Sequence, residues 1–99
     1  MLRPLREYLQ KEYGDRLDRI ILFGSQARGN AKLDKDIDIL IVLKDPVSHS
    51  AEMRHTSHFV AQFYLDHYTV VSRVFMTKSK FENDDSIFLK NVRKNGIVL

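Results

Sequence analysis

The sequence has no cysteine and no tryptophan among its 99 residues, and only two prolines and four glycines. Without cysteine, the chain forms no disulfide bond and offers no thiolate ligand to a zinc ion. No apolar run approaches the ~18 residues of a membrane-spanning helix, and the charged N-terminus lacks the apolar core of a signal peptide. We therefore expect a cytoplasmic protein without a membrane partner, folded as a single domain over residues 1–99.

The charge balance is only mildly basic. Sixteen Lys and Arg residues against thirteen Asp and Glu residues give a net charge of +3. This charge is compatible with a phosphate-bearing partner. The basic side chains are not interleaved with aromatic ones, as they are in a stacking platform for nucleic acid, so the sequence does not favour a nucleic-acid partner. The sequence leaves the oligomeric state open, and a homo-oligomer is among the alternatives.

Hydrophobic spacing and turn residues predict alternating helices and strands. Helices are expected over residues 2–13, 25–28, 48–66 and 86–95, and strands over 19–23, 37–43 and 68–76. The continuous apolar run that ends at Leu43 indicates a central strand, buried on both faces. Ser79 begins a Ser-Lys-Phe-Glu pattern typical of a capping box. Together these elements predict an α/β (α+β) fold, a small mixed sheet with packed helices. The expected core includes the aromatic residues Phe23, Phe59, Phe63, Tyr64, Phe75 and Phe88.

Two aspartates one residue apart stand where the central strand begins. Side chains at i and i+2 of a strand point to the same face, so Asp36 and Asp38 project together, with backbones roughly 6.6 Å apart. Two unit charges at that separation repel by ~2.5 kcal/mol at an effective dielectric constant near 20. A shared divalent cation removes this cost. Oxygen ligands favour Mg²⁺ or Mn²⁺, which typically also bind substrate phosphates.

The turn after the first predicted strand has the features of a phosphate site. Gly24 has no side chain, so a phosphate can approach its backbone closely. Ser25 offers a hydroxyl and an amide at the start of the predicted short helix, where unpaired N–H groups attract anions. Arg28 lies one turn later and can add a charge-assisted hydrogen bond. Gly24, Ser25 and Arg28 are therefore predicted to bind the triphosphate that the metal bridges.

The residues Gly24-Ser25-Gln26-Ala27-Arg28-Gly29 and Lys35-Asp36-Ile37-Asp38 resemble a known pattern. It is that of the minimal nucleotidyltransferases of the polymerase-beta superfamily, which include the MntA-like antitoxins. The resemblance implies a polymerase-beta-like nucleotidyltransferase fold, with Asp36 and Asp38 as catalytic metal ligands and Gly24 and Ser25 holding the nucleotide. It also implies transfer of a nucleoside monophosphate, most simply AMP from ATP, to a hydroxyl acceptor. The family's short members commonly pair with a helical HEPN toxin protein.

Two positions depart from the family pattern. Lys35 replaces the usual serine before Asp36, and no Asp or Glu occurs from Tyr68 to Thr77, where the family carries a third carboxylate. Alignment places Val70 at that position. The nearest acid, Asp66, is expected to be an ordinary residue at a helix end. Two hypotheses remain open: a nucleotidyltransferase, or a non-catalytic nucleotide-binding or antitoxin module of the same fold that acts by complex formation.

Overall fold

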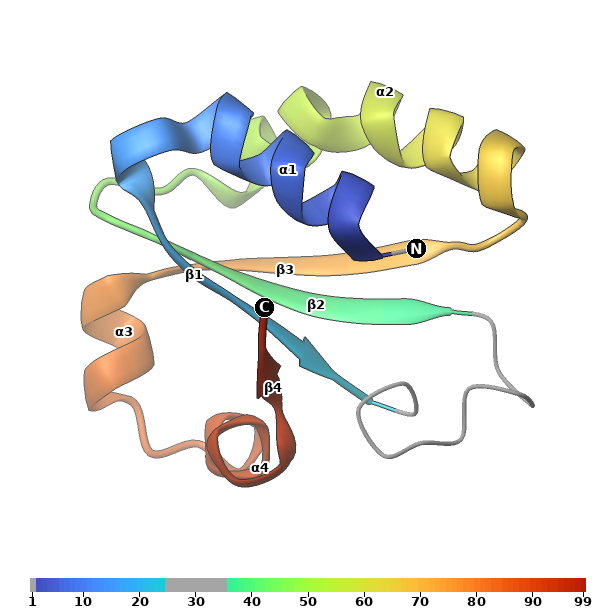
Figure 1. Ribbon diagram of the computed structural model, residues 1–99. Coiled ribbons are helices and arrows are strands. Elements are labelled where there is room, and N and C mark those ends of the chain that lie inside the picture. The colour runs from blue at the N-terminus through green and yellow to red at the C-terminus, as the bar shows by residue number, and fades with distance from the viewer. Residues whose placement is uncertain (1, 25–35) are drawn as a thin grey trace.

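The computed structural model describes residues 2–24 and 36–99. In this part of the chain, four strands form one sheet in the order β3-β2-β1-β4 (Figure 1). The strands are β1 (Leu17–Phe23), β2 (Ile37–Leu43), β3 (Val71–Thr77) and β4 (Ile97–Val98). β1 is antiparallel to both β2 and β4, whereas β2 and β3 are parallel. The predicted small mixed sheet is confirmed, and β2 pairs on both sides as expected of a central strand.

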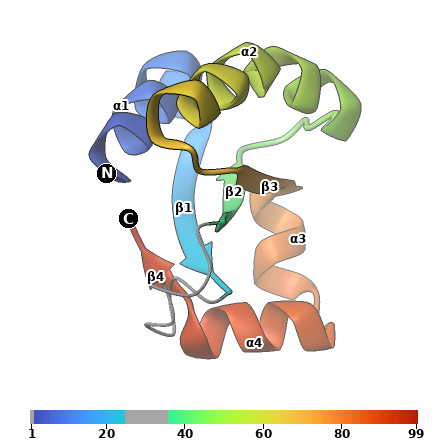
Figure 2. The same ribbon diagram turned by 90° about the vertical axis from the view of Figure 1, so that its right-hand side faces the viewer.

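Helices cover both faces of the sheet (Figures 1 and 2). The helices α1 (Leu2–Tyr13) and α2 (His49–His67) lie on one face, and a short 3₁₀ helix, η1 (Gly14–Arg16), follows α1. The helices α3 (Lys78–Asn83) and α4 (Ile87–Asn95) lie on the other face. β2 therefore sends Ile39 and Ile41 into the core beneath α1 and α2, and Leu40 and Val42 into the core beside α3 and α4. No helix within residues 2–24 and 36–99 is long and apolar enough to cross a bilayer.

A predicted strand start and a predicted helix cap are wrong, both for local reasons. The third strand begins at Val71 rather than Tyr68, because Tyr68 has a left-handed φ of 53° and its N–H donates to Tyr64 O (2.7 Å), which ends α2. The predicted capping box at Ser79 does not form. Thr77 caps α3 by accepting a hydrogen bond from Lys80 N (3.0 Å), whereas the Ser79 hydroxyl donates to Asp45 Oδ2 (3.1 Å). The predicted helix over 25–28 lies outside the described residues.

The predicted aromatic core is correct in part. Phe63 and Phe75 are buried, and Phe23 and Phe59 are half-buried against the core clusters. Tyr64 and Phe88 are instead 47% and 39% exposed. Tyr64 follows the buried Phe63 around α2 and so faces outward. Phe88 precedes the fully buried Leu89 in the first turn of α4, and only Leu89 points into the core.

Candidate functional site

Asp38 lies beside Gly24 at one end of the sheet. The antiparallel register pairs Asp38 on β2 with Phe23 on β1, so the residue after Phe23 reaches the aspartate. Gly24 has a φ of +74°, and a Cβ added to it would overlap the carboxylate oxygen Oδ2 of Asp38. The turn therefore needs a residue without a side chain for two reasons, its backbone conformation and its contact with Asp38. Gly24 and Asp38 are therefore neighbours in the structure.

Strand parity sets the direction in which the aspartates project. Asp38 alternates with Ile37 and Ile39, which face α1 and α2, so it projects from the opposite face. Ile37 N still donates to Val70 O (2.9 Å), so the extended pairing with β3 continues back toward Asp36. Strand parity predicts the same side for Asp36, the residue directly before β2. Asp36 is exposed and Asp38 is half-buried, so both side chains are in contact with solvent.

Ser25 and Arg28, the other predicted nucleotide-binding residues, lie outside the described residues. Their predicted contacts with phosphate remain predictions. The chain leaves β1 at Gly24 and returns at Asp36 to begin β2. Gly24 and Asp36, which flank the predicted phosphate-binding segment, therefore lie at the same end of the sheet, next to Asp38.

The parallel register of β2 and β3 places a different residue opposite Asp38 from the one expected. Ser72 pairs with Asp38, and Val71 pairs with Ile37. Paired residues of neighbouring strands project from the same face, so the Ser72 side chain lies on the aspartate side. Val70 precedes β3 and is 45% exposed. The alignment that placed Val70 on the third strand is wrong, because that strand starts one residue later. The serine beside Asp38 was missed in the sequence because the register of β3 was not known.

Arg73 fixes the strand that carries Ser72. It projects from the opposite face of β3, where its guanidinium donates to Thr56 Oγ1 (2.6 Å) and Met53 O (2.9 Å) of α2. Burial lowers the pKa of Arg73 below its ordinary value. The charged side chain is thus held by α2, and its neighbour Ser72 is left to face the aspartates.

The donor set fits a small hard cation but is not a complete metal cage. Two carboxylates on one face supply the oxygen ligands that Mg²⁺ and Mn²⁺ prefer. Among the described residues, no group of three or more His, Asp or Glu side chains is placed to hold a metal ion. Asp66, the nearest acid in the sequence to β3, is an exposed residue of α2 whose carboxylate accepts a hydrogen bond from Gln62 Nε2 (3.0 Å). It is a helix residue, as predicted.

Comparisons with known proteins identify the family of this chain. The nucleotidyltransferase domain family matches residues 2–97. The provisionally named protein adenylyltransferase MJ0604 of Methanocaldococcus jannaschii is 30% identical over 92 residues, which cover 92% of this chain and 86% of that protein. Two further proteins of that organism, MJ0141 and MJ1305, carry the same provisional name and are 55% and 50% identical over 31 and 44 residues. These shorter matches cover 31% and 41% of this chain, but only 31% and 30% of the two relatives.

Solved structures share the whole fold. A chain from a toxin–antitoxin structure with AMP-PNP aligns with a TM-score of 0.67 and 18% identity, over 99% of this chain and 72% of its own length. A chain from a mutant of the MntA–HpeT toxin–antitoxin pair aligns with a TM-score of 0.66 and 19% identity, over 100% of this chain and 72% of its own. The predicted fold is thereby confirmed. The chain belongs to the nucleotidyltransferase domain family.

Proposed function

We propose that this chain transfers a nucleoside monophosphate, most simply AMP from ATP, to a hydroxyl group on a partner protein. The observation that carries the proposal is the contact of Asp38 with Gly24, on the face that strand parity also predicts for Asp36. The provisional names of the relatives support a protein as acceptor, and the AMP-PNP structure supports an adenine nucleotide as donor. The toxin–antitoxin structures, with the family resemblance, support a helical HEPN toxin as the partner.

The reaction needs an in-line displacement at the α-phosphorus of ATP. The acceptor hydroxyl oxygen forms the new bond to the α-phosphorus, the bond from that phosphorus to the α,β-bridging oxygen breaks, and pyrophosphate leaves with the bonding electron pair. The hydroxyl proton passes to solvent water. Gly24 has no side chain of its own to keep the phosphates from its backbone, and the space that a Cβ would take is occupied by the Asp38 carboxylate. Positioning supplies much of the catalysis in such transfers, so the rigid β1–β2 pairing at Phe23 and Asp38 is the part of the fold that matters most.

Asp36 and Asp38 would hold Mg²⁺ or Mn²⁺, which when bound neutralises charge on the triphosphate. The remaining chemistry depends on the chain's own side chains. A carboxylate opposite Asp38 could accept the proton of the acceptor hydroxyl, but Ser72 stands there. A serine hydroxyl is a poor base at neutral pH. We therefore expect slow transfer.

A radiolabel assay tests the proposed transfer. The purified chain is incubated with Mg²⁺, ATP labelled in its α-phosphate, and a purified HEPN-type helical protein as the proposed partner. The label should move slowly to the partner, and the double variant Asp36→Asn, Asp38→Asn should abolish transfer. The double variant Lys44→Gln, Lys90→Gln is a control for lost surface charges, because both lysines are exposed and neither belongs to the proposed site. Equal labelling by the wild type and the aspartate double variant would contradict the proposal.

Ser72 is also the observation that favours the second candidate function, a nucleotide-binding antitoxin module without catalysis. Without a carboxylate beside Asp38, the chain could still bind nucleotide and cover its partner. Tight binding to the partner with no transfer of label, even at long incubation, would support this function over the first. If the aspartate double variant still formed the complex but no longer inhibited the partner, this result would instead support transfer.

A further inference from the structure

The first turn of α4 presents an aromatic ring next to the candidate site. Phe88 is 39% exposed, and its ring meets Phe23 edge to face, with centroids 5.4 Å apart and planes at 87°. In an edge-to-face pair, one ring covers at most one face of the other. At least one face of Phe88 is therefore left uncovered by Phe23. A half-exposed, anchored aromatic face is a typical surface for stacking a planar ligand.

Phe23 links this ring to the predicted phosphate site. It is the register partner of Asp38 and the residue directly before Gly24. Strand parity places Phe23 on the face covered by α3 and α4, together with Asp38. Phe88 thus contacts the residue that neighbours both Asp38 and Gly24, and it lies on the same face of the sheet as Asp38. Figure 2 shows α4 crossing below the sheet on this face.

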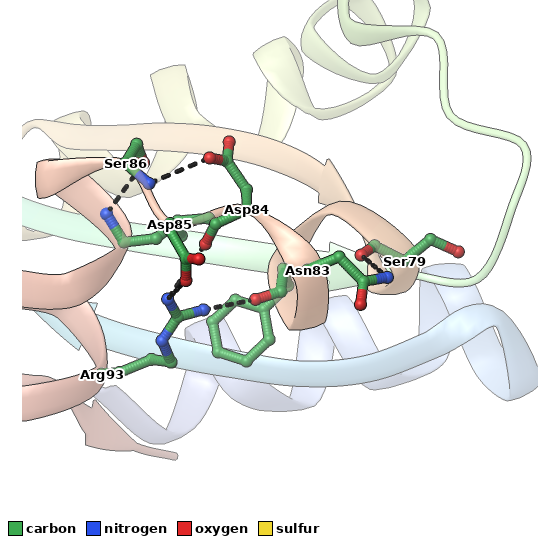
Figure 3. A network of polar contacts seen from close by, with 8 residues as sticks. Ser79, Asn83, Asp84, Asp85, Ser86 and Arg93 are labelled. Carbon is green, nitrogen blue, oxygen red and sulfur yellow. Dashed lines mark hydrogen bonds and ion pairs between the residues drawn. The ribbon is translucent and has the colours of Figure 1, made fainter.

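A polar network fixes the start of α4 and hence the position of Phe88 (Figure 3). The Arg93 guanidinium donates to Phe81 O (2.6 Å) and Asp84 O (3.0 Å), which ties α4 back to the end of α3. Ser86 N donates to the Asp84 carboxylate (2.9 Å), and the Ser86 hydroxyl accepts from Leu89 N (3.3 Å). Ser86 thus caps the first turn of α4, and Arg93 in its last turn holds the helix against the end of α3, so the helix that carries Phe88 is positioned before any ligand binds.

We propose that Phe88 is the stacking platform for the base of the nucleoside triphosphate whose phosphates lie at Gly24 and Asp38. This inference rests on the proposed function and adds a site for the base. The other exposed aromatic pair, Tyr64 and Tyr68, belongs to the end of α2, on the layer that covers the opposite face of the sheet. Stacking uses the π-face that every base has, so this platform binds a nucleobase without selecting one by hydrogen bonds.

Calorimetry with two ligands separates base binding from phosphate binding. ATP and inorganic tripolyphosphate, each with Mg²⁺, are titrated into the wild type and into Phe88→Leu, Phe88→Tyr and Tyr64→Leu. Phe88→Leu keeps an apolar contact with Phe23 but has no aromatic face. It should weaken ATP binding about fivefold to a hundredfold, the range expected for one stacked base, and leave tripolyphosphate binding unchanged. Phe88→Tyr should bind ATP like the wild type, and so should Tyr64→Leu, which removes an exposed ring elsewhere.

The outcomes distinguish this inference from the proposed function. ATP binding by Phe88→Leu at wild-type strength would overturn the stacking role while leaving the phosphate site intact. Equal losses of ATP and tripolyphosphate affinity in Phe88→Leu would also overturn it, because the ring would then support the site's structure rather than the base. Failure of the wild type to bind either ligand would contradict the proposed function itself, and the stacking role with it.

Discussion

At the scale of single residues, Gly24 offers a direct test of the site. Its φ of +74° makes any side chain strained, and a Cβ would also collide with the Asp38 carboxylate. Gly24→Ala should cost about 1 kcal/mol of stability from the backbone alone and should displace Asp38. We expect a marked loss of ATP affinity in Mg²⁺, measured by calorimetry.

Gly14→Ala is the matched control for this substitution. Gly14 also has a positive φ, +51°, but a Cβ there would meet nothing within 4 Å. It carries a similar backbone strain without the collision. Gly14→Ala should therefore lose stability while keeping ATP affinity. If both variants keep full ATP affinity, the Gly24–Asp38 contact has no part in binding nucleotide.

Tyr13 predicts how stability depends on pH. Its buried hydroxyl donates to Glu52 Oε1 (3.0 Å), and burial, followed by the hydrogen bond to Glu52, raises its pKa above the ordinary value of 10.0. The folded state thus keeps a proton that the unfolded chain releases above about pH 10. The stability from protonated Tyr13 is complete below pH 10 and falls as the pH rises further.

Urea unfolding at pH 7, 10 and 11.5 would measure this effect. Tyr13→Phe should lower stability at pH 7 by about 1 kcal/mol, the usual net value of a hydrogen bond, and should flatten the decline above pH 10. Tyr64→Phe, at an exposed tyrosine, is the control and should change neither quantity. An equally steep alkaline decline in Tyr13→Phe would show that other groups cause it.

At the scale of elements, the register of β3 decides which residue could complete a metal site. Ser72 pairs with Asp38, whereas Val70 lies before the strand. Ser72→Asp should add a third carboxylate beside Asp38 and repel it by on the order of 1–3 kcal/mol without metal. Its thermal midpoint should therefore drop in EDTA and rise with added Mg²⁺ by more than that of the wild type, because a bound ion stabilises the folded state.

Val70→Asp is the comparison for this variant, since the sequence alignment alone would choose Val70. It should respond to Mg²⁺ less than Ser72→Asp. Ser72→Asp should also speed the transfer of label to the partner. A larger Mg²⁺ response in Val70→Asp than in Ser72→Asp would mean that the position before β3, rather than the pair of Asp38, completes the ligand set.

At the scale of the whole molecule, two helical layers stabilise the sheet, and the core clusters that they cover differ in size. The layer of α1 and α2 covers the larger core cluster, which contains Phe63 from α2 and Phe75 from β3. The layer of α3 and α4 covers a smaller cluster around Leu40 and Phe81. Since β2 lies between the two layers, a loss of packing in either layer should disturb the strand that carries Asp38.

Phe63→Ala tests the larger layer. Phe63 is only 3% exposed, and truncating a buried phenylalanine typically costs ~3–5 kcal/mol. A domain of this size has a total stability of about 5–15 kcal/mol, so the variant should lose much of it. The midpoint of thermal unfolding should fall sharply, whereas Tyr64→Ala, one residue along α2, should change it little. Similar midpoints for the two variants would show that α2 does not pack through Phe63.

Local sequence signals determined much of the fold. The apolar run that ends at Leu43 predicted the central strand, and the spacing of α1, α2 and α4 predicted their positions to within one or two residues. These patterns succeed because burial follows the period of the element. The Gly-Ser and Asp-x-Asp motifs indicated the family by a different route, through their resemblance to a known pattern. The two-residue β4 was missed, because two residues have no period.

The tertiary structure decided which of these residues meet. Only the pairing of β1 with β2 brings Gly24 against Asp38, and only the register of β3 brings Ser72 rather than Val70 to that aspartate. The capping of α3 by Thr77 rather than Ser79 likewise depends on where β3 ends. Sequence patterns are local, whereas register and contact depend on how distant segments pack. The sequence by itself therefore determined the family and identified Asp36 and Asp38 as candidate ligands, whereas only the tertiary structure determined which residues lie beside Asp38.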